Sequence, residues 1–198
     1  MSNSLRVPFV NKIFPEAKFI HIVRDGRDVT LSAARRWVAP VDYKYLLRKL
    51  RHVPSREIPN SLMQFVNRRA SKLLSKNGSL PSWGPRIPAM LDFVEQHSLE
   101  ESCAKQWASC VARSEEDLSR IPKSRVINVK FEDLVTMPRE TLARIGSWYG
   151  EDLNMQVDSQ IIAKLVSARA QSWKAQAVEF SPLTLSILEA GLKSNGYH

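Results

Sequence analysis

The sequence has few of the residues that build disulfide frameworks or metal sites. Only two cysteines, Cys103 and Cys110, occur among 198 residues. They stand seven positions apart in a helical pattern, so their Cα atoms are expected about 10 Å apart, too far for a disulfide. We therefore predict two buried thiols of a reducing compartment. The four histidines are scattered, and because no metal-ligand spacing is present we expect no metal cofactor.

Long apolar runs are also lacking. No segment approaches the roughly 20 consecutive apolar residues that a transmembrane helix needs. The first residues show no basic stretch followed by an apolar one, as a signal peptide would. We therefore expect no transmembrane segment and a cytoplasmic location. A chain of 198 residues with 43% hydrophobic and 25% charged residues is long enough for one soluble domain, predicted over 1–198.

Positive charge is in excess. The formal net charge is +9, from 29 basic and 20 acidic residues, which favours anionic ligands in general. Much of the excess falls between residues 42 and 76, within a proline-punctuated range, 40–98, that we predict to be an irregular basic insert. A basic amphipathic helix is expected over 61–74, and both a core-facing and a membrane-surface role stay open for it. No nucleic-acid-binding motif accompanies these charges, so we expect no specific nucleic-acid partner.

The segment Lys18 to Trp37, KFIHIVRDGRDVTLSAARRW, organises the chain. Its first part is a short continuous apolar run rich in β-branched residues, which indicates a buried strand of a parallel sheet. The strand ends at a turn signal, Arg24-Asp25-Gly26. A helix follows, because apolar residues recur at intervals of four, and Asp25 is expected to be its N-cap.

Three side chains of this segment are predicted to converge on a phosphate. Arg24 ends the strand, Ser32 lies about two turns into the helix, and Arg36 lies one turn further on the same face. Arginine suits a phosphate because its planar fork donates two parallel charge-assisted hydrogen bonds. Ligands of open α/β sheets also bind beyond the carboxyl ends of the strands. The alternative is that the Arg-Asp-x-Arg-Asp run is a local cluster of ion pairs.

The pattern strand-Arg-Asp-Gly-Arg-Asp-Val-x-x-Ser resembles the 3′-phosphate-binding segment of sulfotransferases that use 3′-phosphoadenosine-5′-phosphosulfate (PAPS). The resemblance implies that Arg24 and Ser32 hold the ribose 3′-phosphate. In some branches, including tyrosylprotein sulfotransferases, an arginine four residues past the serine also contacts this phosphate, and Arg36 matches it. The implied co-substrate is PAPS, and the implied reaction is transfer of a sulfuryl group to an acceptor hydroxyl or amine.

Later segments extend the resemblance more weakly. Phe131-Glu132-Asp133-Leu134 resembles a Tyr/Phe-Glu-Asp-Leu segment of the family, which implies that Phe131 lies near the nucleotide. We interpret the two acidic residues as structural caps or ion-pair partners. Trp173-Lys174 resembles a C-terminal loop that closes over the nucleotide, so Lys174 is a further candidate contact. No residue is assigned a catalytic role.

The order of the remaining elements predicts the fold class. Helices are expected over 5–13, capped by Ser2 or Ser4, over 99–120, over 136–150 with Thr136 as cap, and from Ser181-Pro182 onward. The second clear strand is Arg125 to Phe131. Strand, long helix and strand in succession indicate a parallel α/β sheet. We predict a helix-rich, three-layer parallel sheet of P-loop nucleotide-binding type that is N-terminally truncated.

The truncation is inferred from two motifs that the sequence lacks. It contains no G-x-x-x-x-G-K-[ST] motif and no serine- or threonine-rich phosphate loop, either of which would cradle the 5′-phosphosulfate with backbone N–H groups. We therefore expect the C-terminal portion of a sulfotransferase, with little activity alone. The alternative is a non-catalytic sulfotransferase-like remnant that binds an anionic partner through its basic face. The missing Walker lysine disfavours another P-loop enzyme such as a kinase. The acceptor and the oligomeric state stay open.

Overall fold

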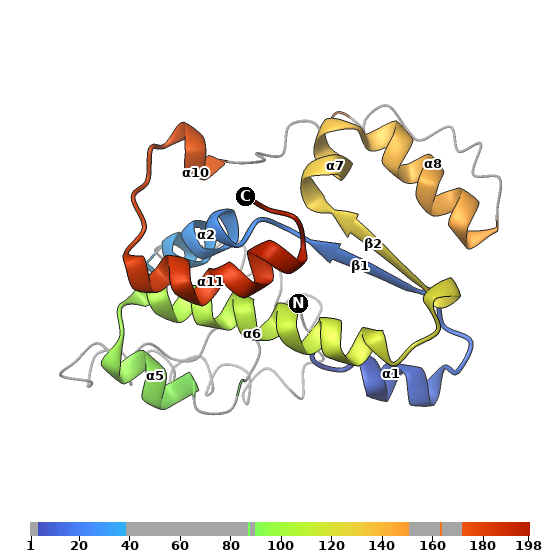
Figure 1. The fold of residues 1–198 in the computed structure, drawn as a ribbon, viewed down its shortest axis with the longest axis horizontal. Helices are drawn as coiled ribbons and strands as arrows, with labels where there is room; N and C mark the ends of the chain where they lie inside the picture. The colour runs from blue at the N-terminus through green and yellow to red at the C-terminus, as the bar shows by residue number, and fades with distance from the viewer. Residues whose placement is uncertain (1–3, 39–86, 88–89, 151–162, 164–171) are drawn as a thin grey trace, which may run out of the picture.

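A two-stranded parallel sheet lies among helices in the computed structural model, which describes residues 4–38, 87, 90–150, 163 and 172–198 (Figure 1). Strand β1 (Phe19–Val23) pairs with β2 (Val126–Lys130), with Phe19 opposite Val126 and Val23 opposite Lys130. The two strands are the apolar runs that the sequence predicted, and their parallel pairing is confirmed. The sheet of the described residues has two strands, so the larger sheet of a three-layer domain is not confirmed.

Helix α6 (Leu99–Ser119) is the longest element of the described residues and packs against α2 and α11. Its start is fixed by a capping box, because the Ser98 hydroxyl accepts from the backbone N–H of Glu101 while the Glu101 carboxylate accepts from the backbone N–H of Ser98. One stripe of α6, with spacings of three and four residues, is buried: Cys103, Ala104, Trp107, Val111, Ser114 and Leu118. Both cysteines are buried free thiols, as predicted.

The helices after β2 begin at once. Helix α7 (Phe131–Thr136) follows the strand directly, and α8 (Pro138–Tyr149) follows α7. The sequence predicted Thr136 as the cap of α8, and this prediction is wrong. The Thr136 hydroxyl donates instead to the backbone oxygen of Glu132 at 2.8 Å, within α7. Gly150 ends α8 with φ of 91°, the left-handed conformation that glycine adopts readily.

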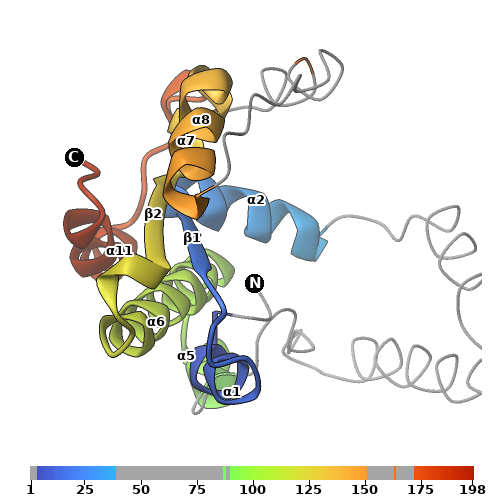
Figure 2. The same cartoon turned by 90° about the vertical axis from the view of Figure 1, so that its right-hand side faces the viewer.

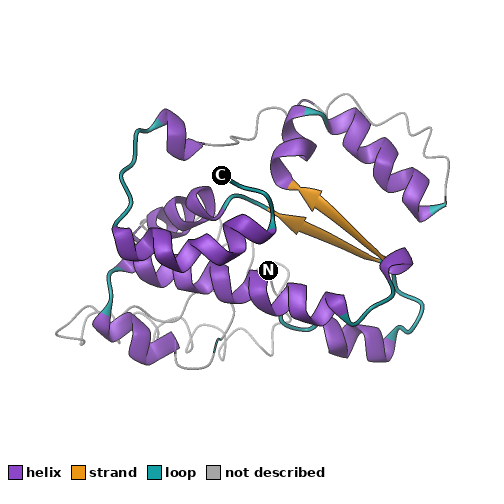
Figure 3. Ribbon diagram, in the orientation of Figure 1, coloured by secondary structure: helices purple, strands orange, loops and turns teal. Residues whose placement is uncertain are grey.

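The other helices of the described residues lie around the two strands. Helix α2 (Gly26–Val38) leaves β1, and α11 (Pro182–Ser194) lies beside α6. Figures 1 and 2 place α6 on one side of the strands and α7 and α8 on the other. The short elements are α1 (Val7–Ile13), α5 (Met90–Gln96), η2 (Lys123–Arg125) and α10 (Ser172–Ala175) (Figure 3).

Two other sequence predictions meet the structure in these short elements. Helix α1 begins at Val7 instead of Leu5, and its cap position is Arg6, without a side-chain cap hydrogen bond, so the predicted serine cap is wrong. The proline next to Val7 suits the first turn, because that turn needs no N–H from it. Helix α5 falls inside the range 40–98. The helix predicted over 61–74 and the basic stretch around it lie outside the described residues.

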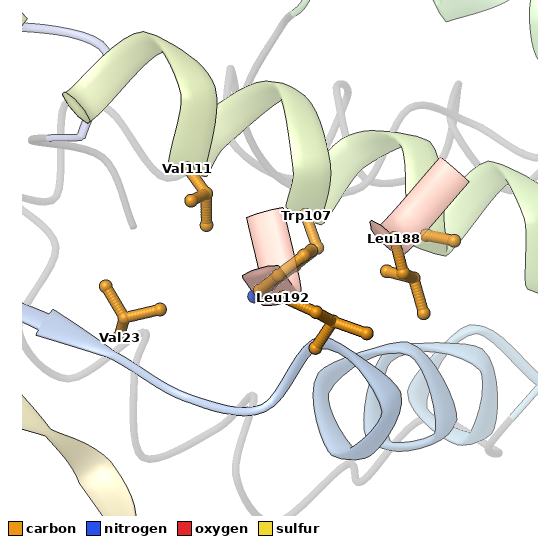
Figure 4. Packing of buried hydrophobic residues seen from close by; sticks show 6 residues of the cluster. Val23, Trp107, Val111, Leu188 and Leu192 are labelled. Carbon is orange, nitrogen blue, oxygen red and sulfur yellow. The ribbon is translucent and has the colours of Figure 1, made fainter. Parts of the chain in front are cut away.

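Trp107 is the centre of the main core. It packs with Val23 of β1, Val111 of α6 and Leu188 and Leu192 of α11 (Figure 4). Two glycines of neighbouring helices let the indole ring approach. A Cβ atom on Gly26 or on Gly191 would lie 2.8 Å from ring carbons of Trp107. The tryptophan therefore fixes how closely α2 and α11 lie against α6.

We expect Gly26→Ala to lower the free energy of unfolding by about 1–3 kcal/mol, because the added methyl group overpacks this contact. Urea denaturation would measure the change. Ser147→Ala, on the exposed side of α8, is the control and should change stability by less than about 0.5 kcal/mol. Equal stability of Gly26→Ala and the wild type would show that α2 is free to move away from Trp107.

Candidate functional site

The candidate site lies where β1 ends and α2 begins. Asp25, 2% exposed, stands between the two elements. Its carboxylate accepts the backbone N–H of Arg27 at 2.9 Å, which is the N-cap interaction predicted from the sequence. The side chain therefore caps α2 directly after the end of β1.

Asp25 also joins this junction to the C-terminal part of the chain. Its carboxylate pairs with the Arg27 guanidinium at 2.9 Å and accepts the indole N–H of Trp173 at 3.2 Å. The Arg27 guanidinium lies 4.1 Å from the centre of a Trp173 ring, within the range of a cation–π contact. Arg27 also donates to the backbone oxygen of His198 at 3.0 Å. These contacts place α10 and the last residues beside the start of α2.

Asp28 pairs with Arg24, as Asp25 pairs with Arg27. It is 1% exposed, and its carboxylate accepts from the Arg24 guanidinium at 3.2 Å and from the backbone N–H of Trp173 at 2.9 Å. The Arg24 guanidinium also lies 4.8 Å from the centre of the Phe131 ring. An arginine held between a buried carboxylate and an aromatic ring has few accessible rotamers. Arg24 is therefore already oriented at the strand end.

Glu132 connects the two strand ends. One carboxylate oxygen accepts the backbone N–H of Asp25 at 3.1 Å, and the other accepts the hydroxyl of Tyr197 at 2.6 Å. The Tyr197 hydroxyl also lies 3.1 Å from the backbone oxygen of Val23. Burial, and then the hydrogen bond to Glu132 and its charge, raise the pKa of Tyr197 well above its ordinary value. Tyr197 therefore stays a hydrogen-bond donor at any physiological pH.

These residues form one unit, the junction cluster, whose members come from the turn between β1 and α2, from α2, α7 and α10, and from the last residues. They are Asp25, Arg27, Asp28, Glu132, Trp173 and Tyr197. The ion pairs Arg24–Asp28 and Arg27–Asp25 confirm the alternative interpretation of the Arg-Asp-x-Arg-Asp run. The sequence did not predict that Trp173 and Tyr197 join them, because nothing local relates these positions. Glu132 was interpreted as a cap or ion-pair partner, and the structure makes it a buried hydrogen-bond acceptor.

A cavity of about 760 Å³ opens beside the junction cluster. It runs along β1 and is walled by residues of α1, α2 and α6. Most of its wall is apolar, including Val29, Trp107 and Val111. Its polar side chains at the carboxyl end of β1 are Arg24, Ser32 and Arg36. The structure thus brings these three predicted residues to a single cavity.

The two remaining predicted residues lie outside the cavity wall. Phe131 stacks against Arg24 and so borders the site through that side chain. Lys174 is exposed on α10, with its ammonium group 5.6 Å from the centre of a Trp173 ring. It lies near the junction cluster only through this neighbour.

The structure shows two further properties of the described residues. They contain no group of three or more histidine, cysteine, aspartate or glutamate side chains placed to hold a metal ion. Of the helices that it describes, none combines the length and apolarity needed to cross a lipid bilayer.

Tyr197→Phe tests the junction cluster. We expect this variant to lower the free energy of unfolding at pH 7 by about 1.5–3 kcal/mol, since a hydrogen bond to a buried carboxylate is lost. Above pH 10 the unfolded tyrosine ionises while the folded one keeps its proton, so the contribution of Tyr197 decreases as pH rises. The difference between wild type and variant should therefore narrow between pH 10 and 11 in urea denaturation. Tyr149→Phe, at a tyrosine that is 51% exposed, is the control, and a difference independent of pH would contradict the raised pKa.

Comparison with known proteins gives one match. Residues 83–155 match the model of the sulfotransferase family. The matched segment contains α5, α6, β2, α7 and α8, so it includes Phe131 and ends before the C-terminal helices. Arg24, Ser32 and Arg36 precede it. Neither a curated protein nor a solved structure matches the chain. The resemblance predicted from the sequence is therefore confirmed by a finding independent of the Arg24–Arg36 motif, and it supports sulfuryl transfer as the general class of reaction.

Proposed function

We propose that this chain binds PAPS and belongs to an enzyme that transfers the sulfuryl group of PAPS to an acceptor hydroxyl or amine. The observation that carries the proposal is the common cavity of Arg24, Ser32 and Arg36 at the carboxyl end of β1. Two guanidinium groups and a hydroxyl supply the donors that a phosphate dianion needs. The family match of residues 83–155 supports the reaction class, and the nucleotide is our assignment.

The junction cluster makes Arg24 suited to a phosphate. One nitrogen of the Arg24 guanidinium pairs with Asp28 at 3.2 Å, and an arginine side chain carries five N–H donors in all. Because Asp28 and Phe131 already orient the group, little conformational entropy is lost when an anion binds. Arg36 is exposed at the surface of α2 and supplies long-range attraction as well as a contact. In this proposal Phe131 borders the nucleotide and Lys174 contacts it from α10.

The proposed reaction is an in-line displacement at sulfur. The acceptor oxygen or nitrogen forms a bond to sulfur while the bond between sulfur and the bridging phosphate oxygen breaks. The nucleotide leaves as 3′-phosphoadenosine-5′-phosphate, and the proton of the acceptor passes to a base. Negative charge develops on the bridging oxygen, so positive groups must face it. In our proposal this chain holds the 3′-phosphate, and we assign none of its residues as the base.

Calorimetric titration with 3′-phosphoadenosine-5′-phosphate tests the proposal without needing turnover. We expect one saturable site, and about 10- to 100-fold weaker binding for Arg24→Ala, because a charge-assisted hydrogen bond is worth about 1.5–3 kcal/mol. Ser32→Ala should weaken binding by a smaller factor. Arg35→Ala is the matched control, because Arg35 is the neighbour of Arg36 on the same helix, bonds to Gln176 and does not line the cavity.

Three outcomes would contradict the proposal. The first is no binding to the folded wild-type chain. The second is equal loss for Arg35→Ala and Arg24→Ala. The third is affinity for any polyanion with a steep salt dependence, which would favour the alternative of a basic face for an anionic partner. We also expect the pure chain to transfer little or no sulfate, since its sequence has no 5′-phosphosulfate motif.

A further inference from the structure

A second cavity, of about 460 Å³, lies beside β2, which runs between α6 and α8 in the view of Figure 1. One face of the sheet contributes His21 and Val23 from β1 and Asn128 and Lys130 from β2, at alternate positions of each strand. The other walls come from α6, α7, α8 and the end of α11. None of the three predicted phosphate contacts lines this cavity, so it is separate from the proposed nucleotide site.

Four charged side chains line this second cavity, which we call the charged cavity: Glu115, Lys130, Asp133 and Arg144. In the part of the chain that the structure describes, none of the four forms an ion pair. The residues that follow Glu115 on α6 differ from it, because Glu116 and Asp117 both pair with arginines of that helix. Two cations and two carboxylates therefore share one cavity without pairing with one another.

The ammonium group of Lys130 is held at the wall of the charged cavity. It donates to the backbone oxygen of Gly196 at 3.0 Å and lies 5.0 Å from the centre of the Tyr197 ring. Gly196 has φ of 66°, and a Cβ atom there would lie 3.2 Å from the Lys130 Nζ, so glycine allows this approach. An ammonium group has three N–H donors, and the contact with Gly196 uses one.

Neutral groups hold two of the other charged side chains. The Arg144 guanidinium donates to the backbone oxygen of Asn128 at 3.4 Å. The Glu115 carboxylate accepts the side-chain N–H of Asn195 at 2.7 Å and the hydroxyl of Ser194 at 3.0 Å. These contacts orient both groups but leave their charges in place, so less conformational entropy is lost when a ligand binds.

We propose that the charged cavity binds a small zwitterion, with an ammonium group at one end and a carboxylate at the other. This inference goes beyond the proposed function and does not depend on nucleotide binding. The carboxylate accepts charge-assisted hydrogen bonds from Lys130 and Arg144, and the ammonium group donates them to Glu115 and Asp133. The volume of the cavity lies in the usual range of small-molecule sites.

The signs of the four charges disfavour simpler ligands. A phosphate dianion or a nucleic acid is attracted by Lys130 and Arg144 but repelled by the two carboxylates, and a simple cation meets the reverse. A metal ion has too few ligands, because the described residues contain no group of three or more side chains placed to hold one. A zwitterion satisfies all four charges, and a singly charged carboxylate adds the least repulsion from Glu115 and Asp133.

The experiment titrates the full chain with three amino acids of increasing length, β-alanine, γ-aminobutyrate and ε-aminocaproate. Nuclear magnetic resonance of the backbone amides reports weak binding and its position. We expect saturable shifts at Asn128–Lys130 and Asn195–Gly196 for the length that fits best. The N-acetyl derivative of that amino acid, which has only the negative charge, should bind at least tenfold more weakly. Its amide, which has only the positive charge, should also bind at least tenfold more weakly.

Arg144→Gln and Asp133→Asn should each weaken binding of the best amino acid about tenfold or more, because each removes one charge from the cavity. The matched controls are Arg139→Gln and Glu140→Gln. They remove the same charges at exposed positions of α8 that do not line the cavity, so both should bind as the wild type does.

Nucleotide titration separates this proposal from the proposed function. Arg144→Gln should keep the wild-type affinity for 3′-phosphoadenosine-5′-phosphate, and loss of both affinities would contradict two independent sites. Absence of nucleotide binding to the wild-type chain would contradict the proposed function alone. The zwitterion site would be overturned if none of the three amino acids bound, if the acetylated or amidated form bound equally well, or if the control variants lost as much affinity as Arg144→Gln.

Discussion

Two buried carboxylates, those of Asp25 and Asp28, hold the candidate site together. Each accepts an arginine of its own turn and a group of Trp173, which is distant in sequence. A buried charge is costly unless it is paired and fully hydrogen-bonded. The two aspartates therefore need the neighbouring arginines and Trp173 as partners, and in turn they hold these side chains in place. Because of this mutual requirement, the end of β1, the start of α2 and the C-terminal segment form one structure.

The local elements of the fold were predictable from the sequence. The apolar runs of β1 and β2 and the buried stripe of α6 follow from periodicity, and the Asp25 cap follows from the residue that begins the helix. The predicted N-caps of α1 and α8 were wrong. Thr136 bonds within α7, and α1 begins two residues later than expected. Such choices depend on the neighbouring turn and not on the pattern of the helix itself.

The candidate site was predictable only in part. The spacing of Arg24, Ser32 and Arg36 within one strand and helix was sufficient to place them together, since both elements are regular. The positions of Trp173 and Tyr197 could not be predicted, because their contacts depend on how α10 and the last residues pack against α2. Sequence patterns report what lies within a few turns, whereas the junction cluster joins residues more than 140 positions apart. The acidic residues that suggested a local ion-pair cluster also bind the distant Trp173, so this cluster is local and long-range at once.

The contact between Tyr197 and the end of β1 has a consequence for the order of folding. The Tyr197 hydroxyl and the Val23 carbonyl are separated by 174 positions, and closing so long a loop is slow compared with forming the helices between them. A ribosome must release nearly the whole chain before this tyrosine can reach its carboxylate. Until then Asp25 and Asp28 have only the arginines of their own turn, Arg27 and Arg24, as side-chain partners among the junction contacts described above.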